Sequence, residues 1–255
     1  MRQLRIGCVP YLNAKPLIDW FHSSDCDVNA TIDYVVPSQL ATMLEENRID
    51  TALVSIFELF QSPGLTLLPG ISISADGPVK SVRLFSCKPF ERVRSVALDT
   101  SSLTSVALTR ILLAEKYGVS PRYDHQPPDL DRMLETQDAG LIIGDLKLFD
   151  TPATHILDLG EAWKQMTDLP FVYAAWLARS DAPVDALTDA LSRARDWGVQ
   201  RLDSLAVTWA EQMNLPLDRV QDYFLNVMQY DLDDEKLEGM RLFEKKCRRH
   251  GLITE

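Results

Sequence analysis

Short apolar runs alternate with amphipathic helical patterns along the first third of the chain. We expect strands at residues 5–9, 30–36, 51–55, 65–74 and 82–87. Between the second and third runs, Pro37 suits the first position of a helix. Leu40, Met43 and Leu44 then recur at helical spacing. Strands that alternate with helices are typical of parallel βαβ units, so this segment predicts an α/β fold class.

A second series of alternating strands and helices begins near Val93. We expect strands at residues 93–98, 122–125, 139–143, 155–159 and 171–178, and helices at residues 104–117 and 130–136. From Val184 onward we expect helices to the end of the chain, where apolar residues from Leu237 to Cys247 form one stripe. Two such series predict two α/β lobes.

The order of these elements predicts a discontinuous first lobe. We expect residues 1–88 and 176–255 to form lobe one, with the C-terminal helices packed on it, and residues 89–175 to form lobe two. Two lobes joined by two chain crossings hinge around a cleft, and ligands of open α/β sheets lie beyond the carboxyl ends of strands. The candidate ligand-binding loops are those that follow Val9, Val54, Leu98 and Ile143.

Composition narrows the partners and the chemistry. The chain has 26 basic and 37 acidic residues, a net charge of -11, so we expect no nucleic-acid partner. It lacks both a long apolar segment and a secretory signal, so we expect a cytoplasmic protein with no membrane partner. Its four cysteines form no CxxC pair, which argues against disulfides and zinc. Without a GxGxxG or Walker loop, we also expect no cofactor.

The loop after Val9 carries the first candidate binding residues. Pro10 and Pro16 would fix the backbone around three polar side chains, and these belong to Tyr11, Asn13 and Lys15. An alternative with equal support is that Asn13 only caps the following helix and that Lys15 is solvated. The residues alone leave both interpretations open.

The loop after Leu98 carries five hydroxyl groups in seven residues. They belong to Thr100, Ser101, Ser102, Thr104 and Ser105, at the predicted start of a helix. Free N–H groups and the positive end of the helix dipole attract anions there, and hydroxyl groups add donors without net charge. Ordinary capping needs only one hydroxyl group, so the excess favours a binding site for a carboxylate.

Other candidates lie at the ends of further predicted strands. Gly144 permits close approach of a ligand to the backbone, and Asp145 either holds a ligand hydroxyl group or caps a helix. Ser55 follows the third strand, and Ser81 precedes the strand that crosses between the lobes. We expect all four residues at the cleft.

The sequence offers few candidates for acid–base chemistry. None of the four histidines lies in a nucleophile elbow or in a His-Glu-x-x-His pattern. His125 and His155 lie at predicted strand ends of lobe two, so either stays a candidate base. Glu58, Asp145 and a bound water stay candidates for the acid.

Six segments along the chain match one known pattern. They are VPYLNAKPL at residues 9–17, GPVKSV at 77–82, VALDTSSLTS at 96–105, LIIGD at 141–145, WKQMTDLPFVY at 163–173 and LEGMRLF at 237–243. In their order and over nearly the whole chain, they resemble the chorismate dehydratases, the first enzymes of the futalosine route to menaquinone. The chain departs from the family at Ser55, where Pro is frequent, at Leu103, where Arg is frequent, and at Leu146 and Lys147, where Ala is frequent.

The resemblance implies a periplasmic-binding-protein-like fold of type II and a lyase that removes water from chorismate to give 3-[(1-carboxyvinyl)oxy]benzoate. In that family the Asn of YLN and the Ser of GPVxSV contact the enolpyruvyl end of the substrate, which implies catalytic roles for Asn13 and Ser81. Neither side chain is a base near neutral pH, so we expect a carboxylate of the substrate to take the proton. A small-carboxylate sensor of the same fold and the related 1,4-dihydroxy-6-naphthoate synthase stay open as alternatives.

Overall fold

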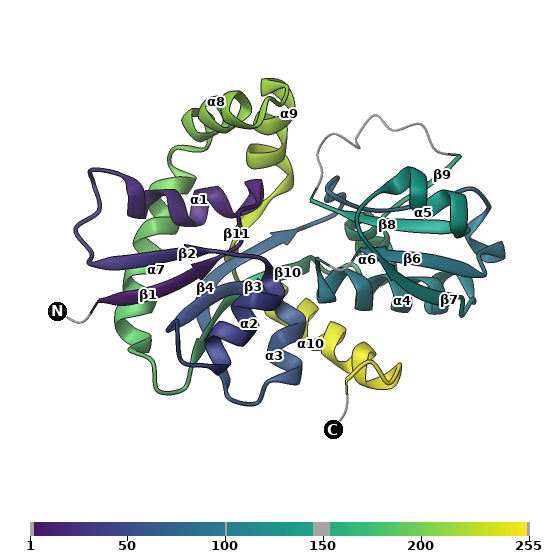
Figure 1. Ribbon diagram of the computed structural model, residues 1–255, viewed down its shortest axis with the longest axis horizontal. Helices are drawn as coiled ribbons and strands as arrows, with labels where there is room; N and C mark the ends of the chain where they lie inside the picture. The colour runs from purple at the N-terminus through teal and green to yellow at the C-terminus, as the bar shows by residue number, and fades with distance from the viewer. Residues whose placement is uncertain (1–2, 100, 145–153, 254–255) are drawn as a thin grey trace. The chain divides into compact units, whose positions relative to one another are not determined.

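The computed structural model describes residues 3–99, 101–144 and 154–253 and divides the chain into two compact units. Unit 1 comprises Met1–Ser74 and Val172–Asp234, and unit 2 comprises Ala75–Phe171 and Glu235–Glu255 (Figure 1). The chain therefore crosses between the units three times. None of the helices in the described part of the chain is long and apolar enough to cross a membrane. The cytoplasmic location stays a prediction.

Unit 1 contains a mixed six-stranded sheet with the order β11-β4-β10-β3-β1-β2. Its strands are β1 (Leu4–Cys8), β2 (Ala30–Tyr34), β3 (Thr51–Ser55), β4 (Leu65–Ala75), β10 (Phe171–Arg179) and β11 (Gln229–Leu232). β1 is parallel to both β2 and β3, whereas β10 is antiparallel to β3. β3 is buried along its whole length, as its continuous apolar run predicts. The loops after β1 and β3 therefore leave the same edge of the sheet.

Helices surround this sheet, and one contact fixes the turn after β1. The helical segments are Leu12–Ala14, α1 (Lys15–Ile18), Asp19–His22, α2 (Pro37–Glu45), α3 (Ile56–Gln61), α7 (Val184–Val199), α8 (Leu202–Met213), α9 (Leu217–Asp222) and a π-helical turn at Tyr223–Val227. In α7, a Cβ atom at Gly198 would lie 1.8 Å from the carbonyl oxygen of Pro16. Only glycine permits this approach, so α7 supports the backbone of α1 directly.

Unit 2 contains a five-stranded sheet with the order β7-β6-β8-β5-β9. Its elements are β5 (Val82–Ser86), a 3₁₀ turn at Phe90–Arg92, β6 (Ser95–Asp99), α4 (Leu103–Tyr117), β7 (Arg122–Gln126), α5 (Leu130–Thr136), β8 (Ala139–Ile143), β9 (His155–Asp158), α6 (Leu159–Thr167) and α10 (Asp234–Arg249). β6 is parallel to β7 and β8, and β5 is antiparallel to β8 and β9. Phe85, Ala97, Met133 and Ile142 pack together in its core.

Three features differ from the sequence-based expectation. The sequence predicts β5 in lobe one, but it lies between β8 and β9 in the unit 2 sheet and is hydrogen-bonded to both. α10 was also expected on lobe one, but Phe243 packs edge-on against Trp163 and Phe171 of unit 2. The segment after Val184 is not entirely helical, because β11 pairs with β4 and the hydroxyl group of Ser72 donates to the carbonyl oxygen of Asp231.

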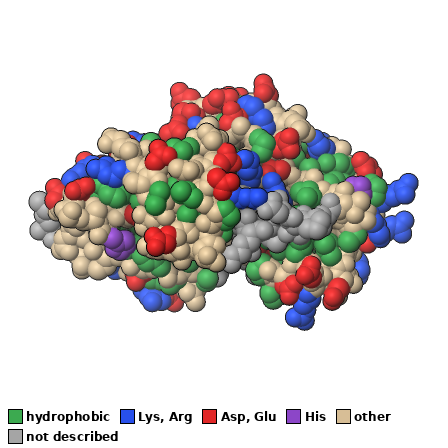
Figure 2. All heavy atoms as spheres, turned by 90° about the horizontal axis from the view of Figure 1, so that it is seen from above, with side chains coloured by type: hydrophobic (Ala, Val, Ile, Leu, Met, Phe, Trp, Pro, Cys, Tyr) green, Lys and Arg blue, Asp and Glu red, His purple; other side chains and the backbone are tan. Residues whose placement is uncertain are grey.

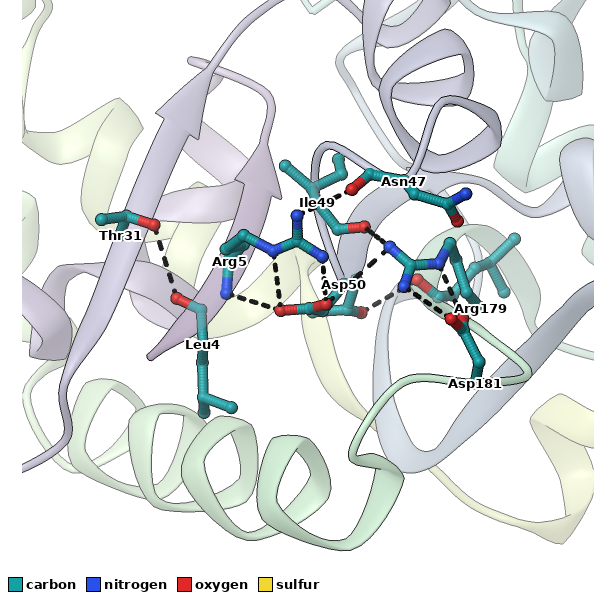
Figure 3. A network of polar contacts seen from close by, with 10 residues as sticks. Leu4, Arg5, Thr31, Asn47, Ile49, Asp50, Arg179 and Asp181 are labelled. Carbon is teal, nitrogen blue, oxygen red and sulfur yellow. Dashed lines mark hydrogen bonds and ion pairs between the residues drawn. The ribbon is translucent and has the colours of Figure 1, made fainter. Parts of the chain in front are cut away.

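A network of ion pairs ties three strands of unit 1 together at the sheet edge opposite the loops after β1 and β3 (Figure 3). Asp50 is fully buried, and its carboxylate accepts hydrogen bonds from the backbone N–H and the guanidinium group of Arg5. Nη1 of Arg179 lies 3.8 Å from Oδ1 of Asp50 and donates to the carbonyl oxygen of Ile49 at 2.6 Å. The network fixes the register of β1, β3 and β10.

Candidate functional site

The turn that leads into β5 presents Ser81 in a fixed conformation. The carboxylate of Asp158 accepts hydrogen bonds from the backbone N–H groups of Val79 at 2.9 Å and Lys80 at 2.7 Å. The same carboxylate caps α6 by accepting from Gly160 and Glu161, both at 3.1 Å. Lys80 has φ of +62°, a conformation that costs a non-glycine residue about 1–2 kcal/mol. Asp158 therefore holds a strained turn directly before Ser81, whose side chain is buried.

A chain of hydrogen bonds connects Ser81 with the hydroxyl-rich loop of unit 2. The backbone N–H of Gly144 donates to the carbonyl oxygen of Ser81 at 2.6 Å. The adjacent N–H of Ile143 donates to Oδ2 of Asp99 at 3.2 Å, and Oδ1 of Asp99 accepts from the N–H of Ser101 at 2.8 Å. Burial raises the pKa of the Asp99 carboxyl group, and the bonds from Ser101 and Ile143 oppose that shift. The structure thus brings Ser81, Gly144 and Ser101 to one edge of the sheet.

Two hydroxyl groups of the loop after β6 serve the helix cap. The hydroxyl oxygen of Ser102 accepts from the N–H of Ser105 at 3.3 Å, and the two hydroxyl oxygens lie 3.1 Å apart. Thr104 is fully buried in the first turn of α4, whereas Ser101 is partly exposed. Capping therefore accounts for Ser102 and Ser105, which is the alternative that the sequence left open. Thr100 lies outside the described residues, as does Asp145 after β8.

In unit 1 the turn after β1 contains a buried amide oxygen that accepts no hydrogen bond from the described residues. Asn13 lies in the 3₁₀ turn Leu12–Ala14, and its Oδ1 atom is buried without a hydrogen-bond partner among the described residues. A buried acceptor without a partner costs roughly 1–3 kcal/mol. Tyr11 is the residue before this turn and is partly exposed. Asn13 does not cap α1, because the cap position is Ala14 and no side chain bonds there.

Lys15 is buried between two aromatic rings of unit 1. Its Nζ atom lies 3.9 Å from the centre of the Trp209 ring and 5.1 Å from that of Tyr34. The indole Nε1 of Trp209 donates to Asp19 at 2.6 Å. Burial raises the pKa of Asp19, while Trp209 and the nearby charge of Lys15 oppose that rise. The lysine is therefore not solvated, and its charge anchors the start of α1 against α8.

The loop after β3 contains a carboxyl group with a raised pKa. Ser55 is buried at the end of β3, where it pairs with Ala174 of β10. Glu58 follows in the first turn of α3 and is partly exposed. Its pKa is raised, mainly by burial and further by the charge of Glu45. A carboxyl group with a raised pKa suits a general acid.

The two candidate histidines lie at different edges of the unit 2 sheet. His125 pairs with Leu98, so it lies one strand away from Asp99 at the edge that carries Ser101 and Gly144. His155 pairs with Ser86 at the other end of β5, at the edge opposite Ser81. Of the two, only His125 shares an edge with the candidate residues of unit 2. No group of three or more His, Cys, Asp and Glu residues within the described ranges is placed to hold a metal ion.

Asp158 and Asp99 were not among the site residues predicted from the sequence, although both accept hydrogen bonds from the backbone of candidate loops. Asp158 ends one strand and precedes a helix, which is a cap signal, but the turn at Val79 and Lys80 is far away in sequence. Asp99 lies inside the DTSS segment, where only the neighbouring hydroxyl groups were predicted to bind a ligand. Only the strand order β6-β8-β5-β9 brings these carboxylates to the loops.

Comparisons of the sequence with known proteins give a consistent result. A family described as menaquinone biosynthesis matches residues 4–249. A chorismate dehydratase of Thermus thermophilus is 33% identical over 95% of this chain and 94% of the relative. A chorismate dehydratase of Campylobacter jejuni is 26% identical over 95% of this chain and 96% of the relative. These matches confirm the resemblance inferred from the motifs.

Comparisons of the structure concern the fold alone, because the sequence identities are low. A protein of Archaeoglobus fulgidus superposes with a TM-score of 0.75 at 15% identity, covering 98% of both chains. A Candida albicans protein described as having the generic periplasmic binding protein fold gives 0.66 at 12% identity, with 100% and 92% coverage. The aliphatic sulphonate binding protein of Escherichia coli also gives 0.66, at 15% identity with 100% and 94% coverage. The expected periplasmic-binding-protein-like α/β fold is confirmed, and the chain belongs to the menaquinone biosynthesis family.

Proposed function

We propose that this chain is a chorismate dehydratase that acts in menaquinone biosynthesis. The observation that carries the proposal is the 33% identity to the Thermus thermophilus enzyme, which extends over 95% of this chain. The family match over residues 4–249 also spans the turn of Asn13 and the turn of Ser81. In these turns the structure has a buried amide oxygen without a partner among the described residues and a strained backbone.

The proposed reaction removes the C4 hydroxyl group and the C3 proton of chorismate and yields 3-[(1-carboxyvinyl)oxy]benzoate and water. The product ring is aromatic, so the elimination is favourable overall. The protein must mainly orient the substrate, protonate the leaving C4 hydroxyl group and place a base near the C3 proton. Orientation alone supplies a large part of such rate enhancements. Hydrogen-bonding side chains in fixed positions are suited to this task.

Asn13 and Ser81 are the proposed catalytic residues and contact the enolpyruvyl end of chorismate. A ligand group that donates to Oδ1 of Asn13 would satisfy a buried acceptor that has no partner among the described residues. Ser81 is suited to the role because Asp158 and Gly144 fix the backbone on both sides of it. Further proposed substrate-binding residues are Tyr11, Lys15, Ser55, Thr100, Ser101, Ser102, Thr104, Ser105, Gly144 and Asp145.

The proposed base is a carboxylate of the substrate itself, because Asn13 and Ser81 do not take up protons near neutral pH. Glu58 is the proposed source of the proton for the departing hydroxyl group, since its raised pKa favours the protonated form. A side chain that acted as the base would contribute about 100- to 10,000-fold to the rate. Replacement of His125 by Ala should therefore reduce kcat less than about tenfold, and a loss of all turnover would contradict the proposed base.

The direct test is to incubate the purified protein with chorismate and to follow the product by ultraviolet absorbance and mass spectrometry. We expect a product lighter by one water molecule. Asn13→Ala and Ser81→Ala should each lower kcat/KM at least ~100-fold. Asn29→Ala and Ser204→Ala, at exposed positions of unit 1, are the matched controls and should keep wild-type activity.

The other outcomes of this test identify the alternatives. Saturable binding of chorismate without conversion would favour a metabolite sensor of the same fold, since a fold alone does not determine activity. Absence of both binding and conversion would contradict the proposal. The naphthoate synthase alternative predicts no release of water from chorismate.

A further inference from the structure

Unit 2 contains an open pocket of about 870 Å³ at the sheet edge opposite Ser81. The segment between β5 and β6 contributes Lys88, Arg92 and Arg94, and the start of β7 contributes Arg122. Glu91 is the one acidic residue among those that line it. Lys and Arg side chains gather at the right-hand edge of the view in Figure 2, where Figure 1 draws unit 2.

The arginines of this pocket are available for a ligand. Arg92, Arg94 and Arg122 are exposed, and none has a carboxylate partner in an ion pair among the described residues. Lys88 is the exception, because its Nζ lies 2.5 Å from Oδ1 of Asp138. In unit 1, by contrast, the guanidinium groups of Arg5 and Arg179 have aspartate partners. Although the chain has a net charge of -11, three guanidinium groups around this pocket have no carboxylate partner among the described residues.

Backbone hydrogen bonds hold this cluster in place. The N–H of Arg122 donates to the carbonyl oxygen of Arg94 at 2.9 Å, so the two arginines start neighbouring parallel strands. The carboxylate of Asp138 accepts from the N–H of Arg94 at 2.9 Å and from Lys88 on its other oxygen. Asp138 therefore ties the beginning of β6 to the segment after β5. The positive side chains project from an ordered sheet edge.

We propose that this pocket binds a small metabolite with two or more phosphate or carboxylate groups. Planar guanidinium groups bind such anions through paired hydrogen bonds. The volume falls within the range of small-molecule sites, about 300–1,000 Å³. A nucleic acid is a weaker candidate, because the net charge of -11 repels a long polyanion while a small ligand needs only the local field.

The pocket and the candidate residues lie at opposite ends of the same three strands. Ser81 precedes β5 (Val82–Ser86) and Cys87 follows it, Arg94 precedes β6 (Ser95–Asp99), and Asp138 precedes β8 (Ala139–Ile143) while Gly144 follows it. Each strand has five residues, which corresponds to roughly 17 Å. An anion in the pocket therefore occupies a site that is separate from Ser81 and does not require the proposed reaction.

Titration calorimetry with inorganic pyrophosphate and, separately, with citrate tests this proposal, with NaCl used to match ionic strength. We expect one saturable equivalent to bind the wild-type chain. Arg94→Gln/Arg122→Gln should raise the dissociation constant of the probe at least ~tenfold. The control Arg132→Gln/Arg241→Gln removes the same charge from exposed positions of unit 2 outside the pocket and should bind as the wild type does. Tighter binding of pyrophosphate would identify a phosphate ligand, and tighter binding of citrate a carboxylate ligand.

Three results would overturn the proposal: no saturable binding of either probe, equal weakening in both double variants, or displacement of the probe by chorismate. The last result would mean that the probe occupies the proposed substrate site. Thermal unfolding with and without pyrophosphate provides a second measurement, because a ligand of the folded state raises the unfolding temperature. That rise should be present in the control variant and absent in Arg94→Gln/Arg122→Gln.

Discussion

Asp50 in unit 1 and Asp158 in unit 2 are both buried carboxylates with a guanidinium partner, but they hold different parts of the structure. Asp50 is bonded to Arg5 and Arg179 and lies at the sheet edge opposite the candidate loops of unit 1 (Figure 3). Asp158 lies 3.7 Å from Nε of Arg83 and also accepts four hydrogen bonds from backbone N–H groups, two in the turn before Ser81 and two at the start of α6. The first carboxylate sets strand register, and the second sets the conformation of a loop. Loss of the first should affect stability, and loss of the second should affect activity.

The largest expected effect is that of Asp50→Ala on stability. The substitution leaves the buried guanidinium group of Arg179 with one partner fewer, and breaking a buried pair costs about 3–5 kcal/mol. Urea denaturation should show this loss in the free energy of unfolding. The kcat of the fraction that stays folded should remain within ~twofold of the wild type.

Asp181→Ala is the control for Asp50. Asp181 also pairs with Arg179, but its side chain is 69% exposed, so its removal should cost about 0–1 kcal/mol. Equal losses for the two variants would show that burial does not decide the strength of this network.

Asp158→Asn should have the next largest effect, and mainly on turnover. The amide keeps one acceptor oxygen but loses the other, so the turn of Lys80 and Ser81 loses part of its support. Misplacement of a reacting group by about 1 Å reduces rates about 100-fold. We expect a fall of this size in kcat for chorismate turnover, with a smaller change in KM.

Two controls separate positioning from a general loss of stability. Asp129→Ala removes another capping side chain of unit 2 and should cost about 1 kcal/mol without a change in kcat. If Asp158 acts through Ser81, then Asp158→Asn should reduce the activity of a Ser81→Ala variant little further. Additive losses would show that Asp158 acts by another route.

Gly144→Ala tests the other side of the Ser81 turn and should have a moderate effect. Gly144 has φ of +75° and nothing within 4 Å of an added Cβ atom, so the cost arises from backbone strain alone, about 1–2 kcal/mol. Thermal unfolding should detect it. Gly64→Ala, which also meets no neighbour but has an ordinary φ, should instead stabilise the protein by about 0.4–1 kcal/mol.

The comparison of the two carboxylates also shows what the sequence could predict. The strands β1, β3, β6 and β8 were predictable, because each is an apolar run with polar residues directly after it. Asn13 and Ser81 were proposed as site residues because they lie in short motifs. Asp158 was not, because its partners at Val79 and Lys80 are 79 and 78 residues away in the chain.

The placement of α10 and β11 was not predictable for a related reason. The apolar stripe of α10 shows that one face is buried, but not which unit covers it, and the contact of Phe243 with Trp163 of α6 decides this. β11 has only four residues and lies between helices, so the sequence did not distinguish it from the helical segments around it. Long-range pairing, rather than local preference, determines both elements.

Glu58 differs from both aspartates in being only partly buried, and its replacement should give the smallest effect. Its carboxyl group has neither an ion-pair nor a hydrogen-bond partner among the described residues, and burial raises its pKa above the ordinary 4.5. The folded state therefore binds the proton more tightly than the unfolded state does. Its contribution to stability is complete below pH 4.5 and is lost as pH rises through the raised pKa.

Glu58→Gln removes this titration. The difference in the free energy of unfolding, variant minus wild type, should therefore increase from pH 4.5 towards neutral pH. Urea denaturation at several pH values measures it, with Glu211→Gln at an exposed position of α8 as the matched control. If Glu58 is also the acid of the proposed reaction, the same variant should lower kcat while Asn13 and Ser81 still bind chorismate. An unchanged kcat would assign the acid to another group and leave the stability argument intact.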